Sequence, residues 1–170
     1  PVMDSTVSII DLITKTELQK VVVGLNPGSI QVAENGFVYV IARGNYGNVP
    51  SRMRRISTVS LQVDKQYNIQ ASSITKYGGK LLLSTFNYGT NSQGIALFDP
   101  ALDSVTNQNF IDIHQVQTLY NVQYDANQNL IYVLDAKGYT NTGYVYVYAA
   151  TGTLLNSYHV GLNPNSILIL

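Results

Sequence analysis

Three short stretches of the sequence concentrate side chains that could hold a ligand. They are 44–54 (GNYGNVPSRMR), 87–93 (NYGTNSQ) and 137–142 (KGYTNT), and each combines tyrosine, glycine and asparagine. A tyrosine ring offers a flat apolar surface and an asparagine amide offers a donor and an acceptor, which suits recognition of a sugar or a peptide. The alternative is that asparagine and glycine only form turns, which the tyrosines cover. The candidate ligand-binding residues are Tyr46, Asn48, Arg52, Arg54, Tyr88, Asn91, Tyr139 and Asn141.

Arginines gather at the end of the first of these stretches and directly after it, at positions 52, 54 and 55. Three guanidinium groups within four residues could hold an anion or an acidic partner, because each presents several charged donors. The alternative is a solvated loop in which the arginine stems cover apolar surface while their charges stay in water.

The elements that must position these stretches follow from the hydrophobic pattern. Short apolar or alternating runs, each closed by turn residues such as Asn35-Gly36 and Gly78-Gly79, are typical of β-strands, and no stretch sustains a helical period. The predicted strands are 7–12, 17–23, 29–34, 37–43, 55–61, 65–71, 72–77, 80–86, 94–99, 109–114, 120–125, 130–136, 143–150, 154–160 and 166–170.

An octapeptide that occurs almost unchanged at two places reveals the organisation of these strands. Residues 23–30 read VGLNPGSI and residues 160–167 read VGLNPNSI. Strands of equivalent type recur between the two copies about every 40–50 residues, four to a repeat, which is the period of a β-propeller blade. The octapeptide is then the crossing from the outer strand of one blade to the inner strand of the next.

The residues of this crossing carry conformational expectations. Gly24 and Gly161 are expected to take the unusual φ of a tight corner. Asn26 and Asn163 precede prolines, which favours extended geometry at both positions.

The sequence therefore predicts an all-β fold, a β-propeller of four-stranded antiparallel blades. We expect a single propeller region over 1–170, with repeats at roughly 29–71, 72–117 and 120–160 and partial blades at 1–28 and 161–170. About three blades are complete, and we expect the chain to be half of a roughly seven-bladed propeller.

One repeat resembles a known family. The segment VSIIDLITKTELQKVVVGLNPGSIQVAENGFVYVIARGNYG is similar to the YVTN/YncE type of β-propeller repeat. The matching residues are Val7, Ile9, Asp11, Thr14, Thr16, Val23, Gly24, Asn26, Pro27, Asn35, Gly36, Val38, Tyr39 and Val40. The middle repeats depart from the pattern, since 70–72 and 118–120 replace the Asn-Pro crossing.

This resemblance implies a setting, while the incomplete set of blades and the tyrosine-bearing loops imply partners. YncE-like proteins are bacterial surface proteins, many of them lipoproteins, so it implies the cell envelope (periplasm or outer-membrane surface, with or without a lipid anchor) or secretion. The expected partners are the remaining half of the propeller or another protein chain, and a glycan or peptide.

Composition narrows the function further. Ten basic and ten acidic residues balance, and only 12% of the chain is charged, so nothing predicts binding to nucleic acid. No run of 18 apolar residues exists, so we expect no transmembrane segment.

The catalytic inventory is thin. The chain has no cysteine, and its two histidines, His114 and His159, fall at the ends of predicted outer strands with no third ligand in view. Asp135 ends a predicted strand near the loop face, but its repeat equivalents are Ala42 and Thr85. We therefore predict no catalytic residue, no cofactor and no metal site.

Two functions remain open. The first is a non-enzymatic binding or scaffold propeller of the bacterial cell envelope. The second is a propeller enzyme, a lactonase-like hydrolase or a quinoprotein-type oxidoreductase, whose key residues lie in a missing N-terminal half.

Overall fold

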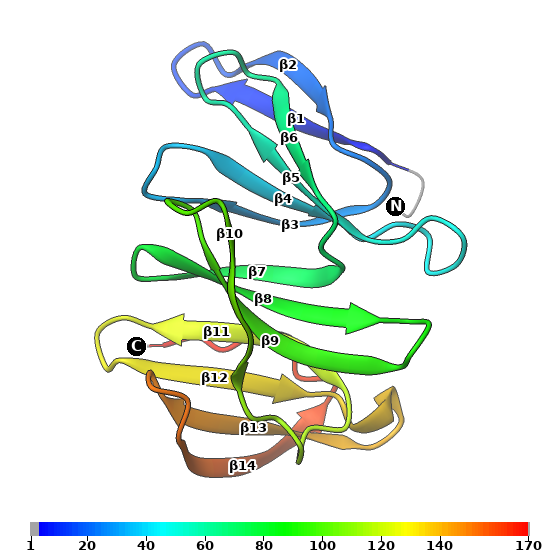
Figure 1. Cartoon of the computed structure of the whole chain (residues 1–170), viewed down its shortest axis with the longest axis vertical. Helices are drawn as coiled ribbons and strands as arrows, with labels where there is room; N and C mark the ends of the chain where they lie inside the picture. The colour runs from blue at the N-terminus through cyan, green and yellow to red at the C-terminus, as the bar shows by residue number, and fades with distance from the viewer. Residues whose placement is uncertain (1–3, 170) are drawn as a thin grey trace. The chain divides into compact units, whose positions relative to one another are not determined.

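The structure, a computed structural model, describes residues 4–169, and this part of the chain is almost entirely β (Figure 1). The elements are β1 (Thr6–Asp11), β2 (Thr16–Val22), β3 (Pro27–Val32), β4 (Val38–Ala42), β5 (Arg52–Ile56), β6 (Val63–Tyr67), β7 (Ala71–Tyr77), β8 (Lys80–Asn87), β9 (Ser92–Asp99), β10 (Ser104–Ile111), β11 (Leu119–Asp125), β12 (Leu130–Asp135), the 3-10 segment η1 (Lys137–Tyr139), β13 (Thr142–Ala149) and β14 (Leu154–Leu162). None of the described residues belongs to a helix long and apolar enough to cross a membrane.

The strands form one two-stranded and three four-stranded sheets. Their orders are β1-β2, β3-β4-β5-β6, β7-β8-β9-β10 and β11-β12-β13-β14, so each strand pairs with its neighbour in sequence. This meander is the strand order of a propeller blade. It confirms the prediction of four-stranded antiparallel blades.

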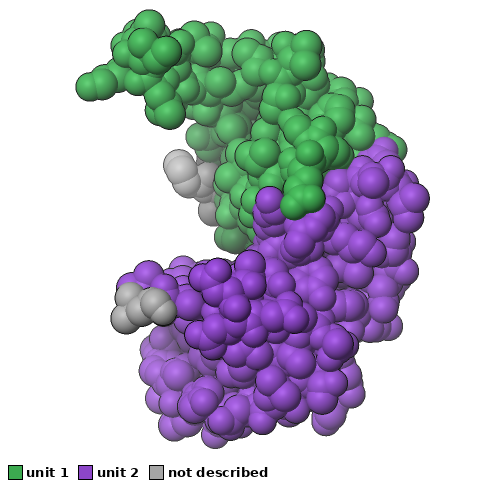
Figure 2. Space-filling view, turned by 90° about the vertical axis from the view of Figure 1, so that its left-hand side faces the viewer, with its two compact units in different colours: residues 1–74 green, residues 75–170 purple. Residues whose placement is uncertain are grey.

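The chain divides into two compact units, residues 1–74 and 75–170, with the boundary inside β7 (Figure 2). In unit 1, alternate residues of the first two sheets turn their apolar side chains toward one another. The buried members of this core are Val21, Val23, Val40 and Ile56.

Unit 2 has the larger core. Buried aliphatic side chains from β8 to β12 meet between its two sheets, and β13 adds Tyr146 and Tyr148. Partly buried aromatic residues at the margin include Tyr77, whose ring lies 4.8 Å from that of Tyr124.

The first strands of successive sheets are linked by side-chain hydrogen bonds to the backbone. In unit 1, Ser29 Oγ of β3 accepts a bond from the Ile74 amide at 3.1 Å. In unit 2, Thr75 Oγ1 of β7 donates to the Val122 carbonyl of β11 at 2.7 Å. These bonds satisfy backbone groups at sheet edges, where no ladder partner exists.

The prediction of a strand over 166–170 is wrong for the described residues 166–169, and Leu170 lies outside them. This segment is tied to β11 by side chains instead of by a ladder. The side-chain amide of Asn121 donates to the Asn165 backbone carbonyl at 2.9 Å, and the backbone amide of Ile167 donates to Gln123 Oε1.

The predicted strand over 55–61 is also misplaced, because β5 ends at Ile56. Ser57 Oγ accepts hydrogen bonds from the amides of Val59 and Ser60, which turns the chain, and Leu61 follows with a φ of 55°. The alternation of serine and apolar residues resembles a strand, but a serine side chain competes for the backbone amides.

At the two crossings, one conformational expectation holds and three fail. Gly24 has a φ of 102°, as expected of a tight corner. Gly161 does not have a positive φ, because it still belongs to β14. Asn26 and Asn163 have φ values of 58° and 51°, in the left-handed region and not extended, a region that asparagine tolerates better than most residues.

Candidate functional site

The three candidate tyrosines are exposed in the loops between the second and third strands of the blades. Tyr46 lies in unit 1 and is 52% exposed, whereas Tyr88 and Tyr139 lie in unit 2 and are 55% and 54% exposed. The loops of unit 2 leave the same end of its sheets (Figure 1).

Each of the two candidate tyrosines of unit 2 stands edge-on against a second aromatic ring. The rings of Phe86 and Tyr88 are 4.4 Å apart at 64°, and those of Tyr120 and Tyr139 are 5.7 Å apart at 78°. Such pairs fix ring orientation at little entropic cost, because an aromatic side chain has only two rotatable bonds.

The candidate asparagines take part in the turns themselves. Asn48 Oδ1 accepts a bond from Asn45 Nδ2 at 2.8 Å, and Asn141 Nδ2 donates to the Lys137 carbonyl at 3.3 Å. Asn91 has a φ of 50°. Turn chemistry accounts for these asparagines.

The three arginines of β5 separate into two environments. Arg55 forms a two-pronged ion pair with Asp64 at 3.0 Å and lies 4.2 Å from the centre of the Phe37 ring. The bonds that Arg55 donates to Asp64 raise the pKa of Arg55 above its ordinary value. Because alternate residues of a strand face opposite sides, Arg52 and Arg54 share the other face.

Arg52 and Arg54 line a pocket of about 250 Å³ within unit 1. Its other lining residues are Gly24, Leu25, Ala42, Gly44, Val49, Pro50 and Gln66. Arg52 Nη1 donates to the Ser51 carbonyl at 2.8 Å, whereas Arg54 Nη1 is buried without a hydrogen-bond partner. Burial, and then the charge of Arg52, lower the pKa of Arg54.

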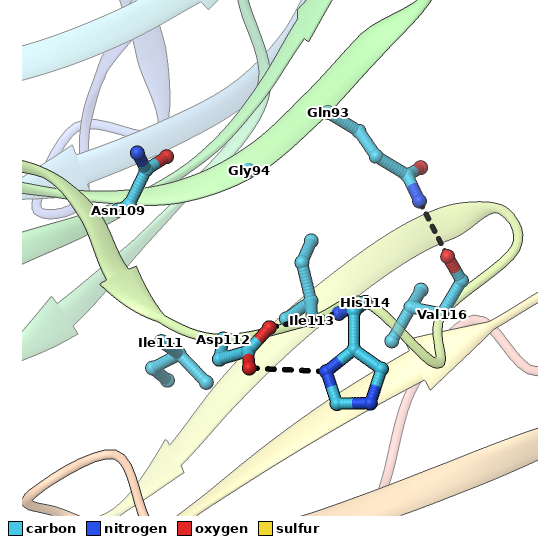
Figure 3. A pocket seen from close by; sticks show the side chains of 8 residues that line it. All are labelled: Gln93, Gly94, Asn109, Ile111, Asp112, Ile113, His114 and Val116. Atoms are coloured by element: carbon cyan, nitrogen blue, oxygen red, sulfur yellow. Dashed lines mark hydrogen bonds and ion pairs between the residues drawn. The ribbon is translucent and has the colours of Figure 1, made fainter.

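A second pocket, of about 490 Å³, lies in unit 2 beside the connection from β10 to β11 (Figure 3). Ile111, Ile113 and Val116 form its apolar lining. His114 Nδ1 lies 3.0 Å from Asp112 Oδ2, and both side chains are largely exposed. Bonds from the His114 amide and ring lower the pKa of Asp112.

The connection beside this pocket is held by a buried carboxylate. Asp135 is fully buried and accepts bonds from the amides of Gln117, Thr118 and Lys137 at 3.0, 2.8 and 2.9 Å. The Lys137 ammonium lies 3.0 Å from Asp135 Oδ2 and also donates to the Gln115 carbonyl. Asp135 therefore anchors the chain and is not exposed to a substrate.

Gln93 acts on the same connection. Its Nε2 donates to the Val116 carbonyl at 2.7 Å, and its Oε1 accepts a bond from the Leu119 amide at 2.8 Å. Sequence reasoning gave no role to Gln93 because both partners follow it by more than twenty residues. The fold brings them together, because Gln93 lies on β9 and its partners lie in the connection to β11 and at the start of β11.

The histidines have separate partners. His159 Nε2 is 2.6 Å from Thr142 Oγ1, and its ring lies against Tyr144 at 5.0 Å. His114 pairs with Asp112 instead. Within residues 4–169, no cluster of three or more histidine, aspartate or glutamate side chains could hold a metal ion.

Comparison with known proteins identifies the fold. No protein-family model matches the chain, and no curated protein does. Among solved structures, hydrazine synthase of Kuenenia stuttgartiensis is similar at a TM-score of 0.70 and 20% identity, over 93% of this chain and 48% of that one. The Dos1 propeller is similar at 0.57 and 12%, over 95% of this chain and 44% of that one. The chain thus has a β-propeller fold and spans about half the length of these structures.

Proposed function

We propose that this chain is a non-enzymatic binding module, a β-propeller that receives a glycan on its tyrosine-bearing loops. The observation that carries the proposal is the pair of exposed, edge-braced rings in unit 2, Tyr88 against Phe86 and Tyr139 against Tyr120. A sugar ring has an apolar face that stacks on such a surface and hydroxyl groups that bond the surrounding loop polar groups.

The resemblance to YVTN/YncE repeats supports the setting that we propose for this function. We propose that the protein belongs to that family. We also propose that it is located in the bacterial cell envelope or is secreted. Envelope surfaces are rich in glycans, so the setting and the proposed ligand agree.

We also propose that polypeptide beyond these residues pairs with the β1–β2 sheet. β1 pairs only with β2 among the described strands, and Ile10, Leu18 and Val22 are 50%, 57% and 70% exposed. A sheet of two strands with an apolar outer face gains stability from further strands.

Glycan binding is tested with an array of neutral and acidic oligosaccharides, followed by NMR titration of the strongest binder. Replacing Tyr88 or Tyr139 by alanine is expected to weaken binding roughly tenfold or more, because a central aromatic contact contributes about 2 kcal/mol.

Tyr158 supplies the matched control. It is 54% exposed on β14, outside the three candidate loops, and its hydroxyl accepts a bond from Asn156. Tyr158→Ala should leave glycan binding unchanged. Equal losses in all three variants, or no binding to any oligosaccharide, would contradict the proposal, and binding to an unstructured peptide alone would redirect it to protein ligands.

A further inference from the structure

We propose that the Arg52–Arg54 pocket of unit 1 binds an oxyanion, a carboxylate or phosphate group. This inference does not rest on glycan binding by the loops of unit 2, since it concerns other residues in the other unit. It assigns separate roles to arginines that the sequence alone groups together.

The pocket contains positive charge without its complement. Two guanidinium groups line it, and none of the nine lining residues carries a carboxylate. Arg54 Nη1 is buried with no acceptor, and an unpaired charged donor costs more than a neutral one. A bound oxyanion supplies acceptors to this donor and neutralises the repulsion between the two arginines.

Elsewhere in unit 1, arginines that serve the fold have their acceptors built in. Arg55 has the carboxylate of Asp64. Arg43 Nε donates to the Ser72 carbonyl at 2.8 Å, and its Nη2 donates to the Gly28 carbonyl at 3.3 Å. Arg54 differs from Arg55 and Arg43, because its buried Nη1 has no hydrogen-bond acceptor. A bound ligand would explain this difference.

The walls of the pocket are held in place by backbone hydrogen bonds. The amides of Arg43 and Gly44 donate to the carbonyls of Asn26 and Leu25, both at 2.9 Å. Gly44 has a φ of 74°, and a Cβ there would overlap the Val49 carbonyl oxygen. The pocket is therefore shaped before any ligand arrives, which lowers the entropic cost of binding.

Gly24 lies close to the Arg54 guanidinium, and the absence of a side chain at Gly24 leaves space beside that group. A Cβ at this position would lie 3.3 Å from Ala42 Cβ and 3.4 Å from Arg54 Nη2. The equivalent Gly161 would meet nothing within 4 Å. Among residues 4–169, Gly24 in the first copy of the octapeptide thus has a close neighbour that Gly161 in the second copy does not have.

The size of the pocket limits what it can take. Its volume of about 250 Å³ lies below the range of roughly 300–1,000 Å³ typical of sites that enclose a whole small molecule. Leu25, Val49 and Pro50 add an apolar rim. The pocket fits one acidic group, either a free anion or the end of an acidic side chain.

The test is an NMR titration of the full chain with sodium phosphate, sodium acetate and a hexaglutamate peptide, against sodium chloride at equal ionic strength. We expect saturable shifts at the amides of Ala42, Gly44 and Gln66 with oxyanions but not with chloride. If the peptide binds more tightly than both free anions, the natural ligand is an acidic segment of a protein. If a free anion binds more tightly than the peptide, the natural ligand is a small anion.

Variants decide whether the arginines are responsible. Arg54→Met and Arg52→Gln are each expected to weaken binding about tenfold or more, as the loss of a charged hydrogen bond predicts. Lys20→Gln removes the same charge from an exposed site of unit 1 and should change nothing. Phosphate should also raise the melting temperature of the unaltered chain but not of the arginine variants.

Two results would overturn the proposal. One is the absence of any shift beyond that caused by chloride. The other is binding by both arginine variants as tight as that of the unaltered chain. Arg52→Gln keeps the test decisive if Arg54→Met fails to fold. Arg52 is partly exposed and donates a hydrogen bond to the carbonyl of the preceding residue, Ser51, so its loss should disturb the fold little.

Discussion

At the scale of single residues, Asp135 shows how one buried side chain can fix a connection. Burial by itself raises the pKa of this carboxyl group, but the amides of Gln117, Lys137 and Thr118 and the ammonium of Lys137 outweigh it. The net pKa lies below its ordinary value. The charged form is therefore the one that the fold stabilises.

We predict that Asp135→Asn lowers the free energy of unfolding by about 3 kcal/mol, because the new amide group would face donors and Lys137 would lose its carboxylate partner. Urea denaturation followed by circular dichroism measures this change. Asp112→Asn, at an exposed carboxylate, is the control and should alter stability little. A loss as large in the control would show that the buried bonds are not the cause.

The same residue sets a pH dependence. Because the folded pKa of Asp135 is depressed, its contribution is fully present above the unfolded value of about 4 and is lost as pH falls through the lower folded pKa. The difference in stability between the unaltered chain and Asp135→Asn should therefore shrink in acid. A difference that stays constant down to pH 2 would contradict this assignment.

At the scale of elements, the sequence predicted most strands correctly because their apolar alternation and turn residues agree. β8, for example, begins at Lys80 right after the predicted Gly78-Gly79 turn. Errors arose where side chains bond the backbone. Ser57 ends β5 in this way, and Gln123 holds the segment at Ile167 without a strand. The bonds of Ser57 are local and compete with the strand, whereas the bond of Gln123 depends on a tertiary neighbour; hydrophobic periodicity reports neither.

Linkage between sheets through Ser29 leads to a second stability prediction. Ser29→Ala removes the acceptor of the Ile74 amide, a bond that joins β3 to β7, and should cost about 1–3 kcal/mol. Hydrogen exchange at the Ile74 amide should accelerate, because this group loses its partner. Ser8→Ala, on the exposed face of β1, is the control. Unchanged exchange at Ile74 in Ser29→Ala would contradict the link.

The candidate site was only partly predictable for a related reason. The sequence placed arginine at 52, 54 and 55, but the partner of Arg55 is Asp64 on the neighbouring strand, which only the register of β5 and β6 reveals. Likewise, Gly24 and Leu25 were assigned to a corner, and their place in the wall of the Arg54 pocket depends on the fold.

At the scale of the whole molecule, the basic and acidic residues balance in number. Ten basic and ten acidic residues give a net charge of zero and a pI near 7.3. Exposed apolar side chains are present as well, among them Leu12 at 86% and Ile13 at 93%. With little electrostatic repulsion at neutral pH, such a surface favours self-association.

We therefore predict that light scattering by the protein is strongest near pH 7.3 and falls at pH 5 and pH 9. Ile13→Lys should reduce scattering at neutral pH by adding charge and removing an apolar tip. Gln128→Lys adds the same charge at another exposed turn but removes no apolar side chain. Comparison of the two variants therefore separates the effect of charge from the effect of losing the isoleucine. Scattering that does not vary with pH would show that charge balance is not the cause.

The connection from β10 to β11 has the backbone of a loop, yet nearly every residue from Asp112 to Thr118 is anchored. Asp135, Lys137 and Gln93 anchor it, together with Tyr148, which donates to the Asp112 carbonyl at 3.1 Å. A protease must draw several residues into an extended form before it can cut. This segment is therefore a poor substrate despite its irregular backbone, and cleavage would fall first on turns such as 88–91.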